Sequence, residues 1–157
     1  MSDLNPAEIY RRYERNELDE AAAVGYLKLI IENSSDDELR VRSVELLGEM
    51  DLKAAEIFKF LEHLAASDAC EEIRIASVQK IIANYLEVGV NHLKWVFQYE
   101  KSIKCLLEIL KSLQSSTSIK AKELISIFER IIGERFIQID EYNKEKRGIG
   151  QIERFLR

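Results

Sequence analysis

The chain repeats part of its own sequence. The stretch 38–44 (ELRVRSV) recurs at 72–78 as EIRIASV, and in the same register Leu47 falls on Ile81. Four of these seven paired positions are identical, and two more exchange one aliphatic residue for another. A repeat with this spacing is typical of a two-helix unit that cannot cover its own apolar face, so that neighbouring units stack to bury one core. The repeat therefore predicts an α-solenoid.

The rest of the chain also has the pattern of consecutive helices. It contains a single proline and six glycines, a composition typical of an ordered helical protein. Asn5-Pro6 is a favourable helix start. The stretch 35–38 (SDDE) matches a capping box, and 68–71 repeats that pattern with aspartate first. Gly89 is predicted to end a helix over 71–88.

The predicted fold is all-α, a right-handed α-solenoid of about four antiparallel helix pairs with a C-terminal capping helix. The 157 residues are expected to form a single domain. The pairs are placed at 6–32, 36–66, 70–99 and 102–132. Separate helices are expected over 119–132 and 134–146, and the segment 134–157 is expected to cap the stack or to dock elsewhere.

The repeated segment resembles a known family. The acidic cap followed by aliphatic, arginine, aliphatic, small and aliphatic positions over 37–50 is similar to the first helix of a HEAT repeat of the phycobilisome-lyase-like type. The stretch 54–61 resembles its second helix. The resemblance is strongest over 35–88, and the Asp-Pro turn usual in that family is missing. It implies that the second helices line a concave face, and that the chain binds a protein, as most members of the family do.

The charge of the chain is unevenly distributed. Its 23 basic and 28 acidic residues leave a net charge of −5, which argues against nucleic-acid binding by the whole surface. From Lys144 onward, however, the sequence contains five basic residues and only two acidic ones. This segment therefore carries a net charge of +3 and the remainder of the chain −8. The leading hypothesis is a scaffold or adaptor for a protein partner whose identity the sequence does not reveal. The alternative is a nucleic-acid-binding protein that uses the basic C-terminal segment.

The sequence offers little for catalysis. It has no Gly-rich phosphate loop and no nucleophile elbow, so we expect no catalytic residues and no cofactor. The candidate soft ligands for zinc are His63, Cys70, His92 and Cys105. Their spacing lacks the close pairs that structural zinc sites use, so no metal site is expected and reduced thiols are the favoured interpretation. An enzyme subunit of HEAT-like form would be indicated only by an unexpected bound metal or cofactor.

The expected location is the cytoplasm. No stretch approaches the roughly 20 apolar residues that span a bilayer. The start of the chain, Met1 to Pro6, is polar and lacks the charged and apolar regions of a secretory signal.

Trp95 and Tyr99 are the candidate partner-binding residues. They lie four positions apart in a short aromatic helix predicted over 92–100, with Lys94 and Gln98 expected to rim the patch. The favoured interpretation places the two aromatic rings in the core beneath 102–113, because aromatic residues are usually buried. The functional interpretation is an exposed hot spot, since tryptophan and tyrosine often anchor interfaces.

The C-terminal segment contains a second candidate surface. Ile152 and Phe155 belong to an amphipathic stretch that is too short to be a stable helix alone. This stretch is expected to fold back as a cap, to dock a partner, or to join another copy of the chain in a homo-oligomer.

Overall fold

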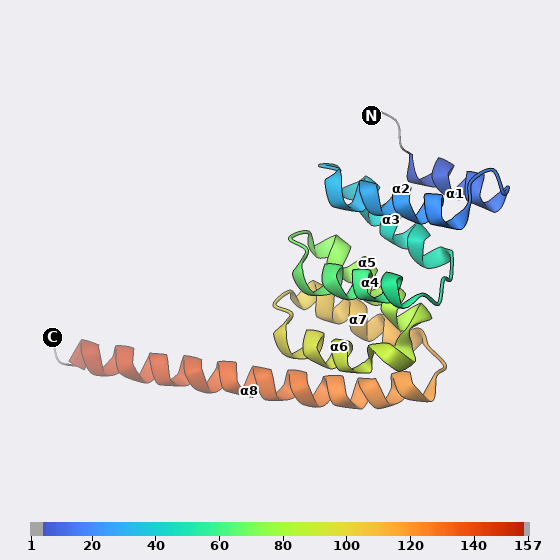
Figure 1. Cartoon of the computed structure of the whole chain (residues 1–157). Helices are drawn as coiled ribbons and strands as arrows, with labels where there is room; N and C mark the ends of the chain where they lie inside the picture. The colour runs from blue at the N-terminus through green and yellow to red at the C-terminus, as the bar shows by residue number, and fades with distance from the viewer. Residues whose placement is uncertain (1–4, 156–157) are drawn as a thin grey trace.

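A computed structural model describes residues 5–155, with side chains described over 5–138 and at Glu141 and Lys144. Within these residues the only regular secondary structure is the α-helix, and there is no strand. The helices, shown in Figure 1, are α1 (Pro6–Glu14), α2 (Glu20–Asn33), α3 (Asp37–Glu49), α4 (Ala55–Ser67), α5 (Glu71–Asn84), α6 (Leu86–Tyr99), α7 (Ile103–Ser115) and α8 (Ile119–Phe155). The all-α prediction is therefore confirmed.

The helices stack in two rows (Figure 1). In one row α1 packs on α3, α3 on α5 and α5 on α7. In the other row α4 contacts α6 and α6 contacts α8, while Lys28 of α2 lies 3.2 Å from the carboxylate of Glu56 on α4. Consecutive helices of the two rows also pack together, as α2 does with α3 and α4 with α5. The handedness of the stack and the boundaries of its repeats stay predictions.

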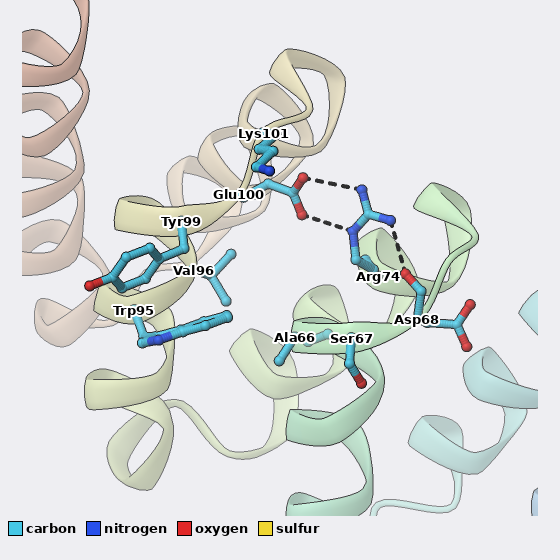
Figure 2. Close-up of a pocket in the computed structure, with 10 residues that line it drawn as sticks. Ala66, Ser67, Asp68, Arg74, Trp95, Val96, Tyr99, Glu100 and Lys101 are labelled. Atoms are coloured by element: carbon cyan, nitrogen blue, oxygen red, sulfur yellow. Dashed lines mark hydrogen bonds and ion pairs between the residues drawn. The ribbon is translucent and has the colours of Figure 1, made fainter. Parts of the chain in front are cut away.

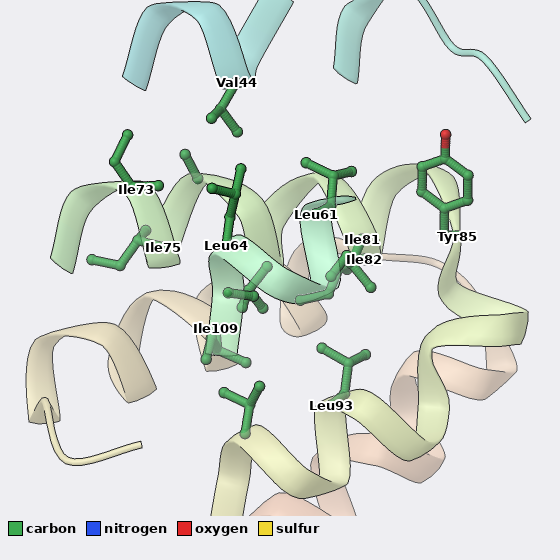
Figure 3. Packing of buried hydrophobic residues seen from close by; sticks show 14 of the residues in the cluster. Val44, Leu61, Leu64, Ile73, Ile75, Ile81, Ile82, Tyr85, Leu93 and Ile109 are labelled. Atoms are coloured by element: carbon green, nitrogen blue, oxygen red, sulfur yellow. The ribbon is translucent and has the colours of Figure 1, made fainter. Parts of the chain in front are cut away.

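Several aliphatic residues of the repeat, among them Val44, Ile73 and Ile81, are buried between neighbouring helices (Figure 3). Leu47 and Ile81 are almost completely buried, as the internal repeat predicts, and Ser43 and Ser77 are equally buried. Small and aliphatic residues recur at these positions because α3 and α5 both pack against further helices on either side. Leu39 is an exception among the aliphatic residues of the repeat, since its side chain is exposed.

The helix starts agree only in part with the predicted caps. Asn5 caps α1 as expected, accepting a hydrogen bond from the backbone N–H of Ala7 at 2.9 Å. The predicted capping box at 35–38 is wrong, because Asp36 is the N-cap of α3 and accepts from the backbone of Glu38 and Leu39. Asp68 likewise does not cap α5. It follows the last residue of α4, and its carboxylate accepts from the N–H of Cys70.

The prediction that Gly89 ends a helix is also wrong. The break lies at Tyr85, between α5 and α6, where φ is −133° and ψ is 22°. The Tyr85 ring packs on Phe58 with centroids 5.5 Å apart, and its hydroxyl donates to the carbonyl of Leu52. Gly89 lies in the first turns of α6, where a Cβ atom would be 2.7 Å from Cγ2 of Ile81. The glycine therefore allows close packing of α6 on α5.

Gly89→Ala is expected to lower the free energy of unfolding by about 1–3 kcal/mol, as overpacking a core does. Cγ2 of Ile81 is attached directly to its Cβ and cannot swing away without a rotamer change. The matched control is Gly133→Ala, because Gly133 is exposed within α8 and a Cβ there meets no atom within 4 Å. That variant is expected to gain about 0.5–1 kcal/mol from helix propensity. Urea unfolding followed by circular dichroism measures both, and equal effects would contradict the packing role of Gly89.

The last helix differs most from the prediction. Instead of separate helices over 119–132 and 134–146 followed by a cap, α8 is one helix of 37 residues. Its first part packs on α6 and α7, and the remainder continues past the stack rather than folding back over it (Figure 1). None of the described helices combines the length and the apolar composition needed to cross a membrane.

Candidate partner-binding groove

Trp95 and Tyr99 are exposed on α6. Their side chains are 45% and 59% accessible, so the favoured interpretation of both as core residues is wrong. The segment 102–113 was expected to cover them. It forms most of α7, which packs instead on α5 and α8 and leaves this face of α6 open.

The exposed face of α6 carries a row of apolar and aromatic side chains. Val88, His92, Trp95 and Tyr99 recur at helical spacing along one side of the helix. The ring centroids of His92 and Trp95 are 6.2 Å apart in a stacked arrangement, and those of Trp95 and Tyr99 are 5.1 Å apart. These contacts hold the rings in place while leaving much of Trp95 and Tyr99 accessible.

Two hollows lie along the seam between this row and α4, and we call them together the α4–α6 groove. The first, of about 230 Å³, lies between the C-terminal ends of α4 and α6 (Figure 2). The second, of about 550 Å³, is lined by Lys59, Glu62, His63, Ala66, His92 and Trp95. Ala66 and Trp95 line both hollows, so the groove runs past the indole ring on both sides.

An ion pair closes one end of the groove. Nε and Nη2 of Arg74 donate to the two carboxylate oxygens of Glu100 at 2.9 and 3.1 Å (Figure 2). Burial by itself raises the pKa of Glu100, but hydrogen bonds from Arg74 and from the backbone of Ser102 lower it further than burial raises it. Glu100 is therefore a buried, charged carboxylate whose charge is matched by one arginine.

Arg74 is one of three arginines, with Arg40 and Arg135, that donate hydrogen bonds to backbone carbonyls at the ends of helices. We call these three residues the arginine ladder. Nη1 of Arg74 donates to the carbonyl of Asp68 at 3.0 Å, satisfying a free carbonyl just after α4. Arg40, which the internal repeat aligns with Arg74, donates to the carbonyl of Ile31 near the end of α2 and pairs with the carboxylate of Asp68. Arg135 of α8 donates to the carbonyls of Phe97 and Glu100 at 2.6 and 2.7 Å. The ladder thus holds the ends of α4 and α6 that form the first hollow.

The charges lining the groove are balanced. Burial lowers the pKa of His92, and burial raises the pKa of Glu62, partly offset by Lys59. Nδ1 of His92 lies 3.7 Å from Oε1 of Glu62, and its Nε2 is buried without a hydrogen-bond partner among the described residues. The first hollow is lined by two acidic and two basic residues, which are Asp68, Arg74, Glu100 and Lys101. The groove therefore lacks the clustered positive charge that phosphate contacts need.

The remaining candidate residues do not join this groove. Lys94 is half-buried and Gln98 is exposed, but neither lines either hollow. The side chains of Ile152 and Phe155 lie outside the described residues, as do most of the basic side chains from Lys144 onward. Docking through these residues, and the nucleic-acid alternative, therefore stay predictions. Sequence reasoning missed Arg74, Glu100 and His92 as groove residues, although the recurrence of arginine at 40 and 74 was a signal.

The four candidate zinc ligands occupy different surroundings. His63 is exposed and lines the groove with His92, whereas Cys105 is a buried residue of α7 and Cys70 precedes α5. Burial raises the pKa of Cys105 to about 12, with the charge of Glu100 adding to the effect, so this thiol stays protonated. No cluster of three or more potential metal ligands occurs in the part of the chain that the structure describes.

Comparison with known proteins identifies no relative. No family model matches the chain, no curated protein is significantly similar to it, and no solved structure matches it. The similarity to HEAT repeats therefore stays a prediction from the residues quoted above.

Proposed function

We propose that this chain is a HEAT-like α-solenoid that binds a protein partner in the α4–α6 groove and has no catalytic role. The observation that carries the proposal is the exposure of Trp95 and Tyr99 beside two hollows. Large aromatic side chains are seldom left accessible together without a use, and tryptophan and tyrosine dominate the energetics of interfaces.

The character of the groove supports a peptide segment as the ligand. Its lining combines aromatic faces with a balanced set of charges, which suits a mixed apolar and polar chain better than a polyanion. The arginine ladder anchors both helix ends, so little ordering of the groove is needed on binding. In this proposal the partner inserts apolar side chains into the hollows on either side of Trp95.

The test is selection of peptides from a display library, followed by a direct binding measurement. Trp95 is the only tryptophan in the chain, so its fluorescence reports occupation of the groove without a label. Selected peptides are expected to change the emission of Trp95 in a saturable manner. Trp95→Ala and Tyr99→Ala are each expected to weaken binding by about 2 kcal/mol or more, roughly thirtyfold in the dissociation constant, measured by calorimetry.

The matched control is Tyr26→Ala on α2, since Tyr26 is also an exposed aromatic residue but lies outside both hollows. All three variants are expected to keep the helical circular dichroism of the wild type, because the replaced side chains are exposed. Peptides that bind the Trp95→Ala and Tyr99→Ala variants as tightly as the wild type would contradict the proposal. So would loss of helicity in either variant, because it would give these side chains a structural role.

A further inference from the structure

The outward side of α7 carries an uncovered apolar stripe. Ile103 and Leu107 are 62% and 51% accessible, and Leu110 continues the stripe as a half-buried residue. Three aliphatic residues at helical spacing on one side of a helix normally face another helix. In the described part of the chain, no helix follows α7 in its row to cover them.

Comparison with α5, the preceding helix of the same row, indicates what the apolar stripe on α7 is suited to contact. The N-caps of α5 and α7 are Cys70 and Ser102, and the two helices can be aligned on these caps. Leu107 thereby corresponds to Ile75, which is buried in a helix that packs on α7. The stripe on α7 therefore has the chemistry that this fold uses, one unit earlier, to receive a neighbouring helix.

The projecting part of α8 needs support as well. A helix of 37 residues is about 55 Å long, and in Figure 1 its red C-terminal part continues beyond the stack. Phe136 and Ile137, at the start of this part, are exposed. Helices in proteins owe most of their stability to tertiary packing, which this part lacks within one copy, and Gly148 and Gly150 lower its helix propensity. Both features lie at the same end of the stack.

At the opposite end of the stack, the α1–α3–α5–α7 row begins with a charged helix. The exposed side chains of α1 include Glu8, Arg11 and Arg12, which are charged. An apolar end cannot extend the stack by packing on such a surface without burying these charges. Head-to-tail association of copies is therefore disfavoured, and pairing of two apolar ends about a twofold axis remains.

We propose that two copies of this chain associate tail to tail, each covering the α7 stripe and the projecting part of α8 of the other. Charge favours the same arrangement. The segment from Lys144 carries +3 and the remainder of the chain −8, so a twofold pair brings each basic segment toward the acidic body of its partner. This association does not involve the α4–α6 groove and is independent of the function proposed for it.

The test is the molar mass of the full chain in solution, measured by sedimentation equilibrium over a range of micromolar concentrations. The wild type is expected to approach twice the mass of one chain. Leu107→Lys and Phe136→Lys are each expected to raise the dissociation constant about a hundredfold or more, because each dimer would bury two unpaired ammonium groups. Both side chains are exposed in a single copy, so circular dichroism is expected to be unchanged.

The matched control is Val88→Lys, which places the same charge on an equally exposed apolar position of α6 and is expected to leave the dimer intact. A wild type that stays monomeric at all concentrations would overturn the proposal. A dimer that survives Leu107→Lys and Phe136→Lys would overturn it too, because the copies would then meet through another surface.

Discussion

Arg74→Met is expected to lower the free energy of unfolding by about 3–5 kcal/mol, the usual cost of breaking a buried ion pair by removing one partner. Methionine keeps the aliphatic bulk of the arginine side chain, so the lost stability reports the removal of the guanidinium group rather than a loss of packing. It leaves the carboxylate of Glu100 buried without its bidentate donor, and it frees the carbonyl of Asp68 that Arg74 also binds. Urea unfolding measures the difference.

The control is Arg42→Met. Arg42 also pairs with a glutamate, Glu45, but this pair lies at the surface, with side chains 48% and 40% exposed. An exposed pair of this kind contributes about 0–1 kcal/mol, so this variant is expected to be nearly neutral. The double variant Arg74→Met with Glu100→Gln removes both charges and is expected to recover part of the loss. No recovery would mean that the unpaired carboxylate is not the source of the instability.

The pH dependence of stability follows from the same pair. The folded-state pKa of Glu100 lies below its ordinary value of 4.5. The pair's contribution is therefore fully present above that value and is lost as the pH falls through the lower, folded pKa. Arg74→Met removes the strongest interaction that lowers the pKa of Glu100, while burial still raises it, so Glu100 is expected to be protonated in the folded state at a higher pH than in the wild type.

Leu47→Ala and Ile81→Ala are each expected to lower the free energy of unfolding by about 2–5 kcal/mol, as large-to-small changes in a core do. Both side chains are almost completely buried at equivalent positions of the internal repeat, one in α3 and one in α5. Each substitution removes buried methyl and methylene groups and leaves a cavity that helices fixed on both sides cannot close easily.

The control for these two variants is Leu39→Ala, because Leu39 lies in the same repeat but is exposed, and it is expected to cost less than about 1 kcal/mol. The urea concentration at the midpoint of unfolding is expected to fall, while the slope of the unfolding free energy against urea concentration stays unchanged. If Leu47→Ala or Ile81→Ala proves harmless, the register of the repeat is wrong.

The helix ends illustrate how far sequence reasoning reaches. Gly89 was used to predict a helix end, yet among the described residues no glycine has positive φ. The positive φ values occur at Asn16 and Asp51, which follow α1 and α3. Asparagine and aspartate tolerate this conformation better than most residues, so the signal was present but weaker than that of glycine. Gly89 serves a contact with Ile81, and this contact exists only once α5 and α6 are packed.

The groove shows a second limit of sequence reasoning. The aromatic residues at 95 and 99 were identified from their type and spacing, but whether they are buried depends on where α7 packs. The opposite wall of the groove comes from α4, which the whole of α5 separates from α6 in the sequence, and its contribution follows no local pattern.

The amino-acid sequence was sufficient to predict the all-helical class, the cap at Asn5 and the burial of the repeated positions at Leu47 and Ile81. These properties depend on local backbone preferences and on the periodicity of apolar residues, both of which can be read along the chain. Three other features became visible only in the packed molecule: α8 continues as one helix, Trp95 and Tyr99 are accessible, and Arg74 joins α4 to α6. They depend on which distant helices pack together, and that choice is made by the balance of burial over the whole chain.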